Sequence, residues 1–273
     1  RSLEPATATY TSKKTPPVEL TAEIRENIYE QTLVTLPAIE IARQGTLIHS
    51  ETFRAITASE LLSIIWGEQR GGTSEHVNQL IEQFDHLSGW VSRTVVDHPD
   101  PKRRSRIFKH WIDVATEFYN LQSFHGVFAI MCGLKHQSVA RMDKTMKLAM
   151  KTNRNRKKSY ELMYQLTDFS QDYANYRPKL AMVAGSCVPF IGCLQRDLIY
   201  VQESFPNKIN NLVNVKKLES CDQIIGQVRR HQNERYDFEP VVEIQEMINN
   251  LPPSMDSIAI MKLSQSMEKK EPK

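Results

Sequence analysis

Apolar residues recur at helical spacing along this chain, and that pattern constrains its fold more than any other feature. In residues 76–90, HVNQLIEQFDHLSGW, the apolar positions are Val77, Leu80, Ile81, Phe84 and Leu87. The next segment repeats the stripe with Ile107, Trp111, Val114 and Phe118. This spacing has the 3.6-residue period of a helix that packs one face against a core.

Local signals at the ends of these segments also favour helices. Thr57 and Glu60 have the spacing of a capping box, in which each side chain accepts a backbone N–H at a helix start. No Asn-Gly or Asp-Gly pair joins two alternating runs, as would be expected of a β-hairpin. The segments 67–74 and 97–105, rich in Gly, Pro or charge, are expected to connect helices.

These observations predict an all-α fold with one large helical domain. We place that domain at residues 18–255, because the connectors are too short to divide it. Residues 1–17 are rich in Thr, Ser, Pro and Lys and are expected to form a flexible lead-in. Residues 256–273 are expected to form a C-terminal helix or tail.

Composition limits the classes of function. The chain has 273 residues, of which 40% are hydrophobic, so it can bury a sizeable core. Its 35 Lys and Arg against 32 Asp and Glu give a net charge of +3, too small to indicate a nucleic-acid partner. The 4 cysteines stand alone, without zinc-site spacing, and indicate reduced thiols in a cytoplasmic protein. We therefore expect neither a metal nor another cofactor.

The ends and the apolar runs give no targeting signal. The most apolar stretch, residues 180–194, is shorter than the roughly 20 residues of a membrane-spanning helix. The chain begins with Arg1 and lacks a signal-peptide pattern, so we expect it to be a piece of a longer protein.

Motifs for bond-breaking chemistry are absent, whereas two basic clusters stand out. The sequence has no GxxxxGK[ST], GxGxxG, HExxH or GxSxG motif, and its histidines show no metal-ligand spacing. The basic clusters are Lys102–Arg106 and Lys151–Lys158. Each is either a solvated loop and helix start or a contact for an anionic membrane or an acidic partner.

The segment CVPFIGCLQRDLIYVQESFP, residues 187–206, carries the main candidate site. A helix that begins after Pro189 has a stripe to bury, made of Leu194, Leu198, Val201 and Phe205. Arg196, Ile199 and Glu203 fall on another face, and Pro206 ends the helix. From periodicity alone, the favoured interpretation is an amphipathic core helix with solvated charges.

Five blocks of the chain carry a family resemblance. They are LPAIEIARQGTLIHSETFRAITASELL, QFDHLSGWV, LQSFHGVFAIMCGLKHQSVARMDKT, YANYR with CVPFIGCLQRDLIYVQESFP, and LVNVKKLESCDQIIGQVRRHQNERY. In this order they resemble the catalytic domain of Ras-family guanine-nucleotide exchange factors, the RasGEF domain. The resemblance covers about residues 36–252.

The resemblance implies a mechanism. In this family a helical hairpin protrudes from the body, and one of its helices opens the nucleotide site of a small GTPase, here a Ras- or Rap-like one. By position, Ile199 corresponds to the apolar residue placed near Mg²⁺, and Glu203 to the acidic residue that enters the phosphate region. No covalent step is implied. The remaining residues expected to bind the partner are Tyr173, Arg196, Lys135, Asp85, Gln202 and Phe205.

Departures from the family pattern leave a second reading open. Asp85 and Lys135 stand where the family usually has Asn, and Ser204-Phe205 replaces the common Gly-Asn. Tyr173 is either a contact for switch II of the GTPase or a core tyrosine. The alternative function is a RasGEF-like scaffold without exchange activity. An accessory helical domain that often precedes this family's catalytic domain is expected to be missing, and recruitment to the inner face of a membrane stays open.

Overall fold

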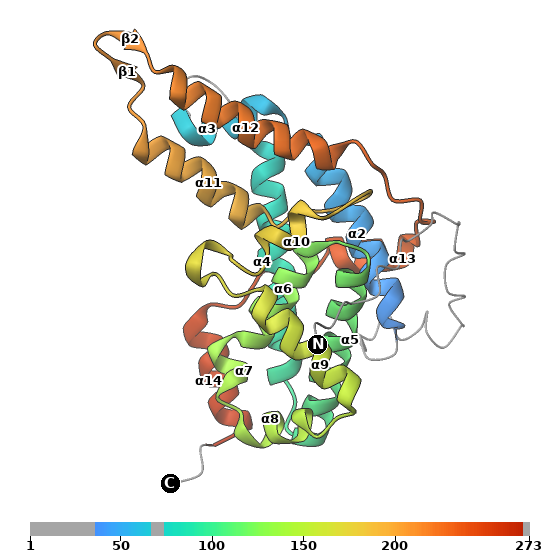
Figure 1. Ribbon diagram of the computed structural model, residues 1–273. Coiled ribbons are helices and arrows are strands. Elements are labelled where there is room, and N and C mark those ends of the chain that lie inside the picture. Colours follow the sequence, from blue (N-terminus) through green and yellow to red (C-terminus); the bar gives the residue numbers. More distant parts are fainter. Residues whose placement is uncertain (1–35, 67–73, 270–273) are drawn as a thin grey trace, which may run out of the picture.

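The helices in the computed structural model, which describes residues 36–66 and 74–269, include those expected from the apolar stripes (Figure 1). They are α2 (Ala38–Ala55), α3 (Ala58–Trp66), α4 (Glu75–Val96), α5 (Pro101–Asn120), α6 (Phe124–Lys135), α7 (Gln137–Ala140), α8 (Asp143–Met150), α9 (Arg154–Leu166), the 3₁₀ turn η3 (Ser170–Asp172), α10 (Arg177–Ala181), α11 (Ile191–Ser204), α12 (Val215–Gln232), α13 (Val242–Asn249) and α14 (Ser257–Met267). The all-α prediction is confirmed. The expected lead-in and most of the 67–74 connector lie outside the described residues.

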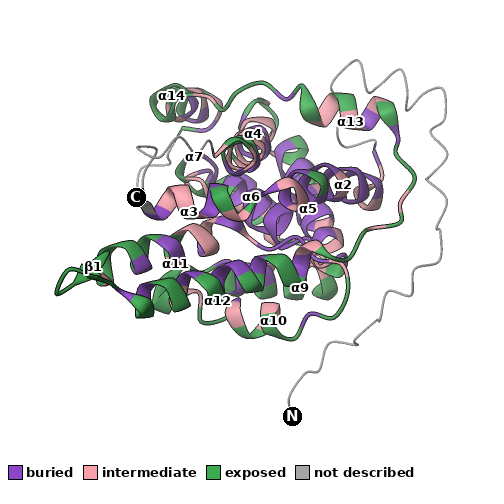
Figure 2. Ribbon diagram, turned by 90° about the horizontal axis from the view of Figure 1, so that it is seen from above, coloured by how far each residue is buried: buried purple, intermediate pink, exposed green. Residues whose placement is uncertain are grey.

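The main core lies between α2, α4, α5 and α6, where buried residues gather in Figure 2. Trp111 of α5 is fully buried, and the ring of Trp90 meets it edge-on with 5.2 Å between ring centroids. Phe118 lies against Gly126 of α6, where an added Cβ would come within 2.5 Å of the Phe118 ring. The close approach of α5 and α6 therefore depends on this glycine.

A second, smaller apolar cluster joins the hairpin to the body of the molecule. Its buried members include Phe53 of α2, Leu80 of α4, Leu198 and Val201 of α11, and Ile224 of α12. Because these helices come from distant parts of the chain, their burial fixes the base of the hairpin to the rest of the domain.

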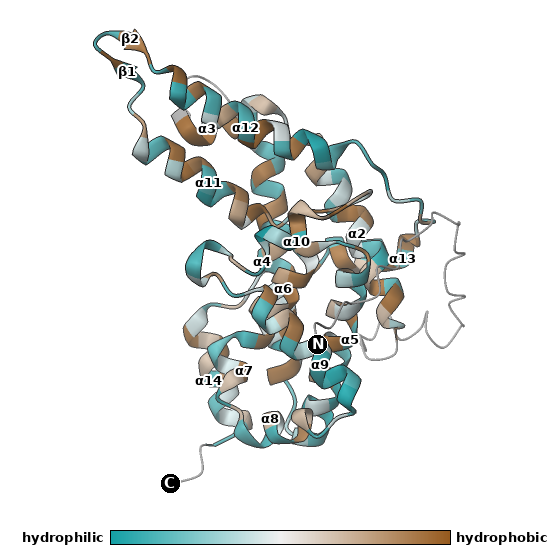
Figure 3. Ribbon diagram, in the orientation of Figure 1, coloured by the Kyte–Doolittle hydropathy of each residue, from teal (hydrophilic) through white to brown (hydrophobic). Residues whose placement is uncertain are grey.

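A hairpin of α11 and α12 projects from the body, and a short strand pair closes its tip (Figure 1). Strand β1 (Lys208–Ile209) pairs antiparallel with β2 (Leu212–Val213). Asn210 and Asn211 join them with φ values of 50° and 65°, as in a type I′ turn. The search for Asn-Gly and Asp-Gly turns did not reveal this strand pair, because asparagine adopts this left-handed region without glycine. The tip exposes hydrophobic residues of both strands (Figure 3).

The capping box at the start of α3 is confirmed. The Thr57 backbone N–H donates to Glu60 Oε2 at 2.8 Å, and the Glu60 N–H donates to Thr57 Oγ1 at 3.2 Å. These reciprocal bonds satisfy backbone donors that a helix start leaves free.

The connector expected at 97–105 is shorter than predicted, because α5 begins at Pro101. The Asp100 carboxylate accepts the backbone N–H groups of Lys102 and Arg103, and proline suits the first helical position. The first basic cluster therefore lies on the opening turns of a helix. Among the described helices, none combines the length and the apolar character that crossing a bilayer would require.

Candidate functional site

The helix expected after Pro189 is α11, and its buried face follows the predicted stripe. Leu198 and Val201 are buried in the second core cluster, and Leu194 and Phe205 pack against it while partly exposed. The predicted register of this helix is confirmed. Burial of Leu198 and Val201 leaves the other side of α11 to face solvent.

Three residues of interest lie on that solvent-facing side. Ile199 is a large apolar residue with 44% of its surface exposed, and Arg196 and Glu203 are exposed on neighbouring turns. Within the described part of the chain, no side chain forms an ion pair with the Glu203 carboxylate. The hairpin thus presents an apolar side chain and, one turn later, an available carboxylate.

Two polar contacts fasten the start of α11 to α10. The backbone N–H of Phe190 donates to the hydroxyl oxygen of buried Tyr176 at 2.8 Å. Arg177 donates from Nη1 and Nη2 to the two carboxylate oxygens of Asp197, at 3.0 Å and 2.5 Å. This pairing with Asp197 raises the pKa of Arg177. The segments YANYR and CVPFIGCLQRDL, adjacent blocks in the sequence, therefore hold each other in place.

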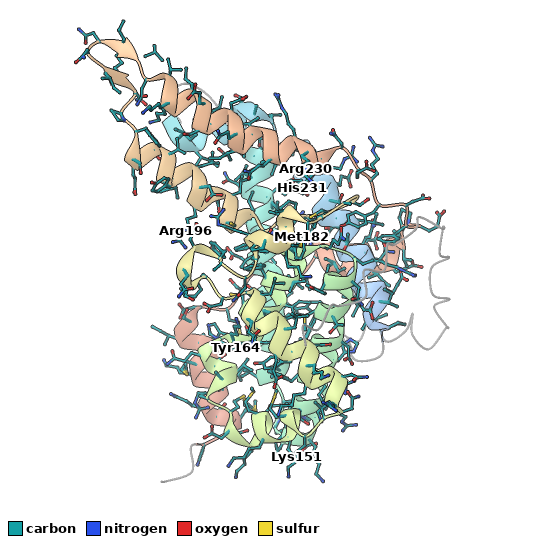
Figure 4. The ribbon with its side chains drawn as sticks, in the orientation of Figure 1. Lys151, Tyr164, Met182, Arg196, Arg230 and His231 are labelled. Carbon is teal, nitrogen blue, oxygen red and sulfur yellow. The ribbon has the colours of Figure 1, made fainter. Side chains whose placement is uncertain are left out.

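Asp172 joins the loop between α9 and α10 to both α10 and α11. Asp172 Oδ1 accepts a hydrogen bond from Arg177 Nη2 at 3.0 Å and lies 3.4 Å from Arg196 Nε. Gln171, Asp172 and Tyr173 have φ values of 50°, 56° and 58°, a left-handed conformation uncommon outside glycine. Figure 4 shows Arg196 on the side of α11 that faces this loop. The two arginines therefore hold a strained loop against the hairpin helix.

Tyr173 lies between the core and the surface. Its ring centroid is 6.1 Å from that of Phe128 and 5.9 Å from that of Phe190, and it is half-buried. The Arg196 guanidinium lies over the ring, 5.6 Å from its centroid, and burial raises the pKa of the phenol. One side of Tyr173 is therefore packed and the other is exposed, so both interpretations, a core tyrosine and a contact for switch II of a GTPase, stay open.

Lys135, at the end of α6, directs its ammonium group at the end of α9. Nζ donates to the Tyr164 carbonyl at 2.9 Å and to Thr167 Oγ1 at 2.8 Å, and it lies 4.0 Å from the Tyr164 ring centroid. Burial lowers the pKa of this lysine. The departure from Asn at this position therefore joins α6 to α9, a role that the sequence did not indicate.

The remaining predicted site residues are spread over the body and the hairpin. Asp85 is exposed on α4. Burial, with a smaller contribution from the Asp85 charge, raises the pKa of the Cys132 thiol on α6. Gln202 is exposed on α11, and Phe205 follows the helix end with its ring partly buried. The structure thus brings Arg196, Tyr173 and the exposed face of α11 together, and leaves Asp85 and Lys135 on the body.

Sequence reasoning missed Asp172, Arg177 and Asp197 as the group that positions α11. The signal was present, since Arg177 and Asp197 both belong to the blocks that carry the family resemblance. A cavity of about 260 Å³ also opens at this base, lined in part by Arg177, Asp197 and, from α12, His231. In the described residues, no group of three or more His, Cys, Asp or Glu side chains is arranged to hold a metal ion.

Comparison with known proteins identifies relatives that are much longer. The chain is 31% identical over 230 residues to Ras guanine nucleotide exchange factor J of Dictyostelium discoideum. This alignment covers 83% of the chain and 28% of the relative. The chain is also 32% identical over 212 residues to Ras guanine nucleotide exchange factor P of the same organism. That alignment covers 77% of the chain and 14% of the relative. The chain therefore spans less than a third of the length of these two relatives.

A family model described as the RasGEF domain matches residues 40–219, from α2 into α12. This range includes the hairpin helix, the loop tied to it and all of the predicted site residues. The match extends over more than half of the sequence, so this chain belongs to the RasGEF domain family.

Proposed function

We propose that this domain is a guanine-nucleotide exchange factor that acts on a Ras-family small GTPase, with Ras or Rap as its candidates. The observation that carries the proposal is the exposed face of α11, where Ile199 and Glu203 project from a protruding hairpin one helical turn apart. The family membership and the names of the relatives support the same activity.

In the proposed mechanism, α11 enters the nucleotide site of the GTPase. Ile199 offers no oxygen ligand to Mg²⁺, a hard cation that binds oxygen atoms in octahedral geometry, so the metal loses its place. Glu203 competes with phosphate for the donors that hold it. At an effective dielectric constant near 20, two unit charges about 4 Å apart interact by about 4 kcal/mol, or roughly three decades in affinity. This magnitude suits the release of a tightly bound nucleotide.

The exchange factor speeds the reaction without setting its direction. Because coupling between two ligands is reciprocal, a protein that weakens nucleotide binding is itself displaced when nucleotide rebinds. The excess of GTP in the cytoplasm, where we propose the protein acts, then loads the GTPase. No covalent bond is made or broken in this scheme.

The other predicted residues have distinct proposed roles at this interface. Gln202 and Arg196 flank Ile199 and contact the partner directly, while Arg196 also keeps Tyr173 in reach of it. Phe205 shapes the corner after α11. Asp85 forms a contact from the body, and Lys135 supports the end of α9 through Thr167. We propose residues 18–255 as the catalytic domain.

The test is release of a fluorescent GDP analogue from Ras, Rap and Ral GTPases, each mixed with the domain. We expect acceleration on one of them and its loss in the Glu203→Ala and Ile199→Asp variants. Glu219→Ala, an exposed carboxylate on α12 of the same hairpin, is the matched control and should retain activity. Binding to a GTPase without any acceleration would overturn the proposal and favour the scaffold function.

A further inference from the structure

The two basic clusters, separate in the sequence, lie together at the end of the molecule opposite the hairpin tip. Helices α5 and α9 both begin at this end, and α8 crosses it (Figure 1). Lys151, labelled in Figure 4, marks the same end. The ammonium group of Lys109, one turn beyond the first cluster on α5, donates to the Lys151 carbonyl at 3.2 Å, so α5 contacts the second cluster.

The face of α5 that carries the first cluster is turned toward the second. Lys102, Arg106, Lys109 and Asp113 follow i, i+4, i+7 and i+11 along one side of this helix. At the far end of this side, Asp113 accepts two hydrogen bonds of 2.7 Å from Arg156, in the first turns of α9. The clusters therefore form one continuous surface, which we call the basic end.

Most positive charges of the basic end are available to solvent. Arg104 and Arg156 are excluded, because Glu268 and Asp113 neutralise them in ion pairs. Asp100, Asp143 and Glu161 are exposed acids beside the clusters. Lys157 is also set aside, because it lies 4.0 Å from Glu161 in an ion pair. The exposed basic residues that remain are Lys102, Arg103, Arg106, Lys147, Lys151, Arg154 and Lys158.

The composition of this surface decides between classes of partner. The large hydrophobic residues exposed in the described chain all lie outside residues 100–158, so the basic end has no apolar centre. Protein interfaces have such a centre and are depleted in lysine. Proteins that bind single-stranded nucleic acid add aromatic side chains for base stacking, and the exposed set has none. Anionic lipid headgroups need only positive charge at the surface.

We propose that the basic end binds the surface of a bilayer that contains anionic phospholipid. The inference does not depend on exchange activity. Bound in this way, the domain holds its hairpin away from the lipid, at the opposite end of the molecule (Figure 1).

The test is sedimentation with vesicles of phosphatidylcholine alone and with vesicles in which a third of the lipid is phosphatidylserine. We expect binding to the anionic vesicles only, weakening as salt is raised. Two double variants remove one side each, Lys102→Ser with Arg106→Ser, and Lys147→Ser with Lys151→Ser. Each should lower the partition coefficient by about tenfold or more, because each residue contributes to the same contact.

The matched control is Lys216→Ser with Arg229→Ser, which removes the same charge from exposed positions of α12. It should bind like the wild type, and melting curves should show that all variants are folded. Three results would overturn the proposal: no preference for anionic vesicles, an equal loss in the control, or an RNA oligonucleotide bound more tightly than the vesicles at the same salt. Loss in only one double variant would reduce the surface to a single cluster and overturn the one-surface inference.

Discussion

Arg177 donates two parallel hydrogen bonds to Asp197, across 20 residues of sequence, at the base of the protruding hairpin. The same guanidinium donates to Asp172, so one side chain fixes both α11 and the strained loop beneath it. The face that carries Ile199 is thereby oriented by residues that are not part of that face.

Replacing Asp197 with asparagine should therefore weaken the domain and loosen α11. The change removes a charge-assisted pair, and we expect a loss of about 1–2 kcal/mol in the free energy of unfolding, measured in urea. Asp222→Asn, on the exposed side of α12, is the control and should be nearly neutral. Equal losses in the two variants would show that the pair with Arg177 does not stabilise the fold.

Neighbouring positions on α11 should respond in opposite ways to the same substitution. Leu198 is fully buried, so Leu198→Asp places an unpaired carboxylate in the second core cluster and should cost about 3–5 kcal/mol. Ile199→Asp, at a position with 44% exposure, should leave the melting temperature close to that of the wild type. Thermal melts of both variants give the comparison, and a stable Leu198→Asp variant would contradict the helix register.

The end of α14 should contribute strongly to stability through a buried ion pair. Glu268 lies 2.5 Å from Arg104 and also accepts hydrogen bonds from Thr145 Oγ1 and the Lys144 N–H. Glu268→Gln leaves the buried Arg104 charge without its counter-ion, and we expect a loss of about 3–5 kcal/mol in denaturant unfolding. Glu246→Gln, an exposed position on α13, is the control. If Glu268→Gln left the free energy of unfolding unchanged, the Arg104 guanidinium would have to be solvated in the folded protein.

The stability of the domain should fall as the solution is acidified. Burial lowers the pKa of His49 from 6.5 to about 4, and the pKa of neighbouring His125, 5.0 Å away between ring centroids, is lowered as well. Above pH 6.5 both rings are neutral in the folded and unfolded chains, so they impose no penalty. Below it the unfolded chain takes up protons that the folded chain excludes, and stability is lost down to about pH 4.

The contribution of His49 to this loss is about 3 kcal/mol across that range. His49→Gln removes one titrating group and should flatten the dependence of the free energy of unfolding on pH. If the free energy of unfolding of His49→Gln had the wild-type slope between pH 6.5 and 5, the His49 ring of the wild type would have to be protonated in the folded state.

Much of the fold could be predicted because its signals are local. The stripe of α11 follows from the spacing of four apolar residues, and the structure buries Leu198 and exposes Ile199 as that spacing requires. The capping box of α3 is likewise a contact between residues three apart. The Asn-Asn turn was missed, because its left-handed conformation depends on the pairing of β1 with β2 as well as on residue type.

The interaction partners of the charged residues could not be predicted from the sequence. In the sequence Lys135 reads as an exposed contact for a partner, yet its ammonium group caps the end of α9. Arg104 belongs to a basic cluster by sequence, yet it is buried against Glu268. In both cases the partner lies about 30 or more residues away, and no periodic signal connects the two positions.

The sequence by itself determined the helical class, the register of α11 and the family of the chain, because helical periodicity and ordered motifs are properties of consecutive residues. Only the tertiary structure decided that Arg177 links Asp172 to Asp197, that Lys135 is internally bonded and that two basic clusters form one surface. These features depend on which helices pack side by side, and hydrogen bonds and charge neutralisation form between whichever side chains that packing brings into contact.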